Sequence, residues 1–343
     1  MLIRNIFELR LYFPNHAFDE SNSFAGSAYN SEIDFLKDKL GEKLYDKLND
    51  KLESIDPNSF IAKINDNTAL SYYEQLLYMC QRCVAFDSIG RTASINAISI
   101  NGTGMNVATS GDYGNADTKA VDNFKLSCMK EAHTAINVLL ATLESWSIKS
   151  VTIEDADLKE IVDDWKLSKY YYLANSLFIP SAVVMQEYLN FYENREKFIQ
   201  MLPDLKYIQE ELIESIIGPD LSDYLISAIN KATTDNVLLR LINLLRKFMT
   251  ASLEARTQVI KINEKRVDEA HHEAVAYTNK ISDYISAHLD LWLASEDADL
   301  VNAVKLTPQY IKRKEEEAKA TMPLNTVVAR EDDALFMPIA GIM

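Results

Sequence analysis

Hydrophobic residues recur every three or four positions through most of this sequence, which is the period of an amphipathic α-helix. In the first half of the chain such stripes cover 33–52, 70–84 and 121–146. Gly41 lies inside the first stripe, and a glycine weakens a helix interior. The pattern therefore predicts one helical segment with a potential break at Gly41, followed by two long amphipathic helices.

The helical period is lost between Gly90 and Asn115. Short apolar alternations, AISI and TGMNV, flank the pair Asn101-Gly102. Asn-Gly between alternating apolar residues is typical of a β-hairpin, because both turn positions adopt positive φ. The sequence predicts a hairpin over 97–107 that projects from a helix bundle.

The helical period returns after Ser150. The predicted helices there cover 151–165, 168–191, 195–217 and 236–263. Pro180 should start or kink the second of them. The pair Gly218-Pro219 should separate two helices, because proline cannot continue a helix but suits its first position.

Two stretches of the chain resemble each other across the break at a glycine. FLKDKLGEKLYDKL at 35–48 aligns with LIESIIGPDLSDYL at 212–225, so that Gly41 matches Gly218. Each stretch is followed by a long helix, an interruption and a last helix that ends in Trp146 or Trp292. The alignment predicts two weakly matched copies of one helical unit, with a short polar stretch near 261–268 replacing the hairpin in the second copy.

The two ends of the chain lack the helical period. The first, MLIRNIFELRLYF, is apolar but carries Glu8 and Arg10 and runs into Pro14, so it fits neither a signal peptide nor a membrane span. We expect an extended arm. After Lys319 the chain mixes apolar residues with two prolines, and a purely solvated tail would not need so many apolar side chains.

We therefore predict a mostly α fold, built from duplicated helical-bundle units with one projecting β-hairpin and extended N- and C-terminal arms. Its predicted parts are an N-terminal arm over 1–30, a first helical unit over 31–150 with the hairpin at 97–107, a second helical unit over 151–305, and a C-terminal helix and extended arm over 306–343. The few glycines and prolines, nine and eight in 343 residues, fit long helices better than a chain of many tight turns.

The net charge changes the picture of possible partners. At -16 it disfavours a protein that grips nucleic acid through its phosphates, because such binding depends on Lys and Arg replacing counterions. The negative charge is still compatible with the wall of a channel through which DNA passes, because like charges prevent the duplex from binding to the wall.

Candidate catalytic and metal-binding residues are few. Cys80 and Cys83 have metal or redox spacing, but they lie in a helical stripe with only Cys128 as a further sulfur, which predicts buried core cysteines. The stretch His271-His272-Glu273, with Glu269 one turn earlier, lacks the spacing that puts two imidazoles on one helix face, and a polar helix start explains it equally well.

Gly102, Gly104, Gly111 and Gly114 are followed by no phosphate-binding motif and are interpreted as hairpin and turn glycines. The sequence contains no GxSxG elbow and no recognisable set of nucleophile, base and orienting residue. We therefore predict no enzyme activity, no cofactor and no metal, and expect a structural or interaction protein.

Three groups of residues are candidates for interfaces. A lone two-stranded hairpin is marginal in water and gains stability by adding to another surface. Three consecutive tyrosines on a predicted helix cannot all face one core. The apolar residues of the tail should be buried on a neighbour. The candidates are Ile98, Ile100, Met105, Val107, Tyr170, Tyr171, Tyr172, Val327, Val328, Leu335, Phe336, Met337 and Ile339.

Several stretches together resemble a known family. They are LRLYFPN near the start, LGEKLYDKL, the helix, hairpin and helix that follow, and REKFIQMLPDLKYIQEELIESIIG. The chain resembles the head-tail connector proteins of tailed bacteriophages, also called head-completion or adaptor proteins. The duplication departs from the simplest single-bundle connectors.

The resemblance implies a virion structural protein of the neck, at the head-tail interface, assembled in the host cytoplasm. It implies a homo-oligomeric ring, commonly of twelve copies, whose partners are the portal protein and the tail and neck proteins. DNA would pass through the lumen without specific binding, and no membrane would be involved.

Two other functions stay open at the level of sequence. One is a cytoplasmic all-α scaffolding or regulatory protein that acts through helix-groove contacts. The other is a hydrolase with an unrecognised site. A mass in solution near twelve chains favours the ring, whereas a stable monomer with a defined pocket favours the hydrolase.

Overall fold

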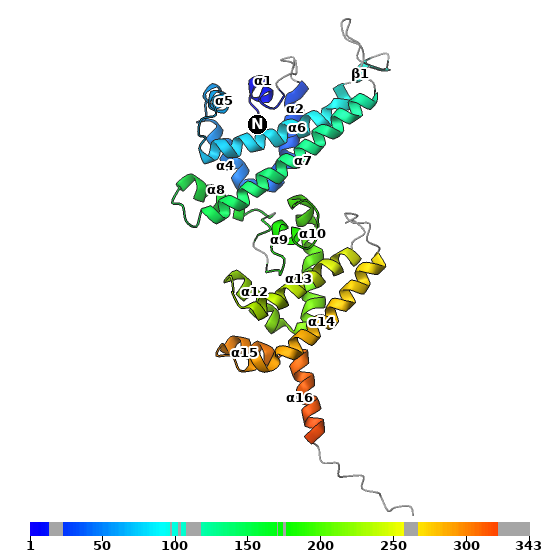
Figure 1. Ribbon diagram of the computed structural model, residues 1–343. Coiled ribbons are helices and arrows are strands. Elements are labelled where there is room, and N and C mark those ends of the chain that lie inside the picture. The colour runs from blue at the N-terminus through cyan, green and yellow to red at the C-terminus, as the bar shows by residue number, and fades with distance from the viewer. Residues whose placement is uncertain are drawn as a thin grey trace, which may run out of the picture. The chain divides into compact units, whose positions relative to one another are not determined.

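The computed structural model describes residues 1–13, 23–96, 98–101, 104–107, 118–169, 171–173, 176–256 and 267–321. This part of the chain is mostly helical, as predicted (Figure 1). It divides into two compact units, Met1–Pro203 (unit 1) and Asp204–Met343 (unit 2). No helix within the described ranges is both long and apolar enough to cross a membrane.

Unit 1 is organised around a pair of long helices, α6 (Tyr72–Asn96) and α7 (Thr118–Lys149), which pack along each other (Figure 1). Unit 1 also contains α1 (Ile6–Arg10), α2 (Ser23–Ser31), the π-helix η1 (Glu32–Lys37), α3 (Asp38–Leu40), α4 (Glu42–Leu52), α5 (Pro57–Asn65), α8 (Ala156–Lys166) and α9 (Ala182–Gln186). Helix α10 (Arg195–Tyr207) begins in unit 1 and ends in unit 2. Helix α2 packs against α6, and α6 and α7 together supply the three buried cysteines and several of the buried leucines.

The predicted boundary between residues 150 and 151 is wrong, because α8 packs back onto unit 1. Trp165 is fully buried, and its Nε1–H donates to the backbone carbonyl of Lys39 at 3.2 Å. The Tyr73 hydroxyl donates to Glu160 at 2.8 Å. These contacts join residues far apart in sequence, and the local pattern of α8 carries no information about them.

The first thirteen residues are not an extended arm. Leu2 and Leu9 are fully buried in unit 1. The Leu2 N–H donates to Glu32 Oε1 at 2.6 Å, and the Gln81 side chain donates to the Leu2 carbonyl at 2.9 Å. Burial raises the pKa of Glu32, although hydrogen bonds from Leu2 and Tyr45 act in the opposite direction. Of the rest of the predicted arm, residues 14–22 lie outside the described residues, and residues 23–30 belong to helix α2.

Two short strands follow α6. Strand β1 (Ile98–Asn101) pairs antiparallel with β2 (Gly104–Val107), with Ile98 opposite Val107 and Ile100 opposite Met105. Asn101 pairs with Gly104 and therefore belongs to the strand, not to the predicted turn position.

The predicted helix over 168–191 is also wrong. Among the residues described in this stretch, only α9 is helical. Its N-terminus is capped by Ser181, whose hydroxyl accepts the Val184 N–H. The residue before a proline avoids the α conformation, which disfavours a helix that runs through Ile179 into Pro180. Tyr192 and Glu193, just after the predicted helix, have positive φ.

Unit 2 is organised around α13 (Asn236–Arg256) and α14 (Val267–Leu293), which pack along each other. The π-helix η2 (Ile208–Ile213), α11 (Glu214–Ile217), α12 (Pro219–Asn230), α15 (Ala298–Lys305) and α16 (Pro308–Thr321) complete it. Helix α12 begins at Pro219, as predicted from the Gly-Pro pair.

Gly41 and Gly218 have nearly the same backbone geometry, with φ of +84° at both and ψ of 154° and 150°. Each follows a π-helix and a short α-helix, and each donates its N–H to the carbonyl four residues earlier at 2.9 Å. The chain turns at each glycine into the next amphipathic helix. The predicted break at Gly41 is confirmed.

A second match lies further along the chain. The sequence EDADL occurs at 154–158 and again at 296–300. In both places its first aspartate caps a helix: Asp155 accepts the Leu158 N–H at 2.9 Å, and Asp297 accepts those of Asp299 and Leu300. The two capped helices are α8 in unit 1 and α15 in unit 2.

Candidate interaction sites

The three tyrosines predicted to lie at an interface differ in what the structure shows of their burial. Tyr172 is only 2% exposed, and its hydroxyl donates to Glu144, which also accepts from Arg195 at 2.8 Å. Burial and the negative charge of Glu144 raise the pKa of Tyr172. The interface assignment of Tyr172 is therefore wrong, because its ring belongs to the core of unit 1.

Tyr171 is half-buried and meets Trp165 edge-on, with ring centroids 4.9 Å apart. Tyr170 lies outside the described residues. The helical argument fails for Tyr171 and Tyr172, because residues 167–169 and 171–173 are not helical.

The other predicted interface residues fall in two groups. Ile98, Ile100, Met105 and Val107 occupy two directly opposed pairs of the β1–β2 ladder, and alternate strand positions share one face of a ribbon. The tail residues Val327, Val328, Leu335, Phe336, Met337 and Ile339 lie outside the described residues.

The three cysteines are buried and free, as predicted. Burial raises the pKa of Cys80 and Cys83, so these thiols remain protonated and unreactive. His271 and His272 lie exposed near the start of α14. Within the described ranges no three His, Cys, Asp or Glu side chains gather as metal ligands would.

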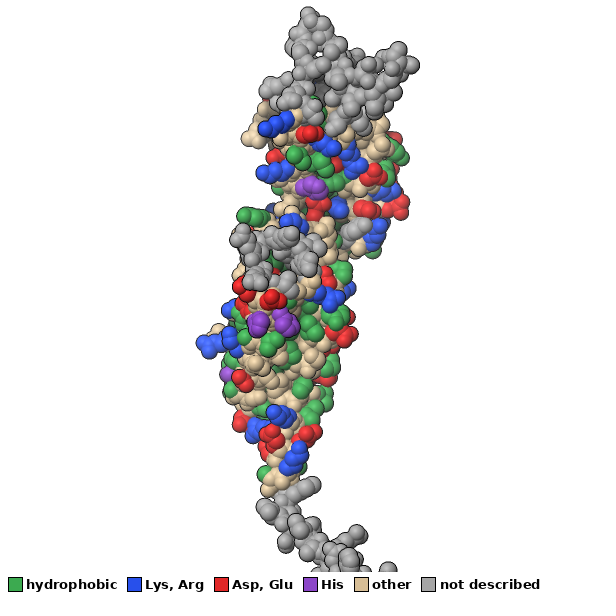
Figure 2. Space-filling model, turned by 90° about the vertical axis from the view of Figure 1, so that its right-hand side faces the viewer, with side chains coloured by type: hydrophobic (Ala, Val, Ile, Leu, Met, Phe, Trp, Pro, Cys, Tyr) green, Lys and Arg blue, Asp and Glu red, His purple; other side chains and the backbone are tan. Residues whose placement is uncertain are grey.

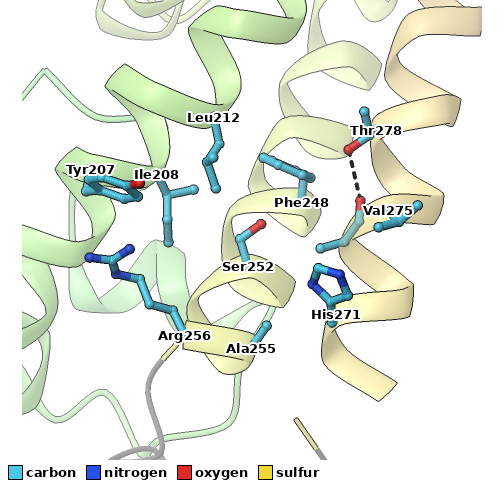
Figure 3. A pocket seen from close by; sticks show the side chains of 11 residues that line it. Tyr207, Ile208, Leu212, Phe248, Ser252, Ala255, Arg256, His271, Val275 and Thr278 are labelled. Carbon is cyan, nitrogen blue, oxygen red and sulfur yellow. Dashed lines mark hydrogen bonds between the residues drawn. The ribbon is translucent and has the colours of Figure 1, made fainter. Parts of the chain in front are cut away.

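Unit 2 contains a pocket of about 390 Å³ that the sequence did not reveal. It opens between η2, α13 and α14, and most of its wall is apolar (Figure 3). The lining residues are Tyr207, Ile208, Leu212, Phe248, Ser252, Ala255, Arg256, His271, Ala274, Val275 and Thr278. Its size lies within the range of protein ligand sites.

Ser252 lies in the middle of these residues (Figure 3). Its side chain is 7% exposed, and its hydroxyl is buried without a hydrogen-bond partner among the described residues. The hydroxyl of Thr278, in contrast, donates to the Ala274 carbonyl at 3.2 Å. A buried hydroxyl without a partner costs about 1–3 kcal/mol.

Arg256 lies at the rim of the pocket. Its Nε donates to Asp204 at 2.8 Å, and its guanidinium lies 3.9 Å from the ring centroid of Tyr207. Hydrogen bonding to Asp204 raises the pKa of Arg256, which keeps the guanidinium charged. The pocket thus combines an apolar wall, one unsatisfied hydroxyl and one cation.

Unit 1 has a polar cluster at the matching place. The buried residues of α6 recur at the same spacing in α13, as Tyr73, Leu76, Leu77, Cys80 and Val84 against Leu238, Leu241, Ile242, Leu245 and Met249. Continuing this register matches Asp87 with Ser252 and Arg91 with Arg256. Ser31 and Ile208 correspond likewise, at the same separation before Gly41 and Gly218.

In that cluster the Asp87 carboxylate is held from two sides. The Ser31 hydroxyl donates to it at 2.6 Å, and Arg91 Nε pairs with it at 2.6 Å. In unit 2 an arginine is kept, because Arg256 matches Arg91. Ser252 stands in place of Asp87, and Ile208 stands in place of the donor Ser31. This alignment of buried positions was the signal that could have located the pocket.

On the face shown in Figure 2, acidic and basic side chains are interspersed with hydrophobic ones. Several lysines are paired with carboxylates, such as Lys43 with Asp164 at 2.7 Å and Lys47 with Glu160 at 2.6 Å.

Comparison with protein-family models, curated proteins and solved structures found no match to this chain.

Proposed function

We propose that this chain is a virion structural protein of a tailed phage, forming a head-tail connector ring that joins the portal to the tail and lines the DNA exit channel. The observation that carries the proposal is the β1–β2 ribbon. Within the described residues it is a sheet of two strands only, which leaves both edges unpaired. Free edges and marginal stability favour pairing with another chain.

The charge of the chain supports the same function. A net charge of -16 repels a DNA duplex, which suits a channel wall that must let DNA slide. The paired lysines of unit 1 further weaken any attraction to phosphates. The partners of such a ring are other copies of the chain, the portal and the tail and neck proteins.

The proposal includes a duplicated architecture. The matching glycine geometry, the repeated aspartate caps and the shared spacing of buried residues in α6 and α13 support two copies of one helical unit. In an experimental structure, the backbone of Glu32–Trp146 without the hairpin should superpose on Gln209–Trp292. Helices that run in the opposite order or direction would contradict the duplication.

The mass of the full chain in solution tests the ring. Native mass spectrometry, with and without a portal protein from a tailed phage, should give an assembly near twelve copies. A chain that stays monomeric in both conditions contradicts the ring and favours the scaffolding alternative.

The hairpin can be tested separately by replacing 97–107 with a short polar turn. We expect the helical circular dichroism to be retained and assembly to be lost, because the strands would no longer be present to pair. As a matched control, Ile153→Ser changes an exposed apolar residue of the α7–α8 loop and should leave assembly intact. Normal assembly of the hairpin variant would show that the ribbon is no interface.

A further inference from the structure

We propose that Pro203 is a hinge at which the two helical units change their orientation relative to each other while each unit keeps its own packing. The inference rests on one helix, α10, which begins in unit 1 and ends in unit 2. It does not depend on the proposed function, because a single chain contains both units.

The chain passes from unit 1 to unit 2 once, between Pro203 and Asp204. Relative motion is the default expectation for two compact units of one chain. Such motion requires that the connecting segment bends. A helix is stiff along its length unless its ladder of hydrogen bonds is interrupted, so the place of any interruption in α10 decides where the bend occurs.

Pro203 interrupts this ladder at the boundary itself. It lies inside α10 and has no N–H, so it cannot donate to the carbonyl of Ile199, four residues earlier. The proline ring also crowds that carbonyl, and sharp bends in helices commonly occur at prolines for these reasons. Because Pro203 is exposed, a bend there breaks no buried contact of its ring.

The other prolines of the described helices leave the hydrogen bonds intact. Pro57, Pro219 and Pro308 begin α5, α12 and α16. A proline in the first position costs no hydrogen bond, because the first N–H of a helix has no partner within the helix. Within the described ranges Pro203 alone lies in a helix interior, and it lies at the boundary between the units.

The part of α10 before Pro203 is fixed to unit 1. Arg195 pairs with the buried Glu144 at 2.8 Å, and Glu196 pairs with His133 at 2.7 Å. Both partners lie on α7, one of the two long helices of unit 1. Phe198 is fully buried. This part of α10 therefore moves with unit 1.

The part of α10 after Pro203 is fixed to unit 2. Asp204 accepts from Arg256 Nε at 2.8 Å, and the Arg256 guanidinium lies 3.9 Å from the ring centroid of Tyr207. Arg256 is the last residue of α13, one of the two long helices of unit 2. A change in orientation of the units therefore concentrates its bending in α10 at Pro203, between the two fixed parts.

Unit 1 offers a matched position for comparison. Gly26 lies as far before Gly41 as Pro203 lies before Gly218, and its helix α2 leads into a π-helix as α10 does. Both residues weaken a helix interior. Gly26 lies within unit 1, where α2 packs against α6. Gly26→Ala therefore stiffens a helix without affecting the boundary.

Double electron-electron resonance between nitroxide spin labels measures the hinge in the full-length chain. One pair of labels crosses the boundary, with Ile148→Cys on α7 and Leu291→Cys on α14, both at exposed positions. A second pair, Ile148→Cys and Phe7→Cys, lies within unit 1. The native cysteines are buried, and an excess of unlabelled chain separates labelled copies in any assembly.

The distance distribution across the boundary should be about twice as wide as the distribution within unit 1, because only the first pair spans the bend. Pro203→Ala restores the donor to the Ile199 carbonyl, so the distribution across the boundary should narrow by about half. The matched control, Gly26→Ala, should leave both distributions unchanged.

Two results would overturn the proposal. One is a distribution across the boundary that is as narrow as the distribution within unit 1. The other is a wide distribution that Pro203→Ala leaves unchanged, which would place the motion elsewhere. Circular dichroism checks that each variant folds. If Pro203→Ala does not fold, Pro203→Gln restores the same donor with another good helix former and is measured in its place.

This measurement and the measurement of mass fail separately. A ring whose chains show a narrow distribution contradicts the hinge alone. A monomeric chain that shows a wide distribution contradicts the ring alone.

Discussion

Gly41 and Gly218 adopt backbone angles that residues with a Cβ rarely adopt. A Cβ at Gly41 would also lie 2.7 Å from the Cβ of Ser168, whereas at Gly218 its nearest neighbour, the Leu306 carbonyl, is 3.4 Å away. The two glycines thus share the backbone requirement, and Gly41 alone adds a severe steric conflict.

Gly41→Ala should therefore destabilise the chain more than Gly218→Ala, with the backbone contributing roughly 1–3 kcal/mol at each site. Urea unfolding measures both. The control is Gly26→Ala, since Gly26 lies in α2, has no atom near its missing Cβ and should be neutral or stabilised by alanine. Equal losses at positions 41 and 218 would rule out the contact with Ser168.

Tyr45 gives a prediction for alkaline pH. Burial, reinforced by the neighbouring Glu32, raises the pKa of Tyr45 to about 12. An unfolded tyrosine releases its proton near pH 10, so between about pH 10 and 12 the unfolded state binds fewer protons and stability falls as pH rises.

Tyr45→Phe should reduce this slope in urea unfolding free energies measured from pH 9 to 11. Tyr192→Phe, which changes an exposed tyrosine, should leave the slope as it is. An unchanged slope in Tyr45→Phe would show that other groups cause the alkaline loss.

At the scale of elements, the N-terminal residues act as part of the core. Leu2 is fully buried, whereas Phe7 on α1 is 58% exposed. Leu2→Ala should cost about 2–5 kcal/mol through lost burial and a residual cavity. Phe7→Ala, the larger truncation, should cost far less. Thermal and urea unfolding measure both, and similar effects would show that the N-terminus does not stabilise unit 1.

The helices differ in how far the sequence predicts them. The long helices α6, α7, α13 and α14 follow from their apolar period. The stretch 168–191 has comparable apolar content but is mostly irregular, because Pro180 and contacts such as Tyr172 with Glu144 outweigh helix propensity.

At the scale of the whole molecule, the tail can be separated from the core. The last described helix, α16, is largely exposed after Arg313. Truncation after Ala320 should leave the melting of the monomer nearly unchanged and should abolish association with neighbouring copies. A truncated monomer that melts much earlier, or that associates with full affinity, would contradict an intermolecular role for the tail.

The sequence by itself determined the helical class, the breaks at Gly41 and Gly218, and the burial of the cysteines. These features depend on period, backbone restriction and polarity, which are local properties. Only the tertiary structure decided that α8 belongs to unit 1, that Tyr172 is buried and that unit 2 contains a pocket at Ser252. Each of these features depends on contacts between residues that are far apart in the sequence. The sequence alone therefore does not show that the Asp87 carboxylate of unit 1 is buried with its partners, or that the Ser252 hydroxyl of unit 2 has none among the described residues.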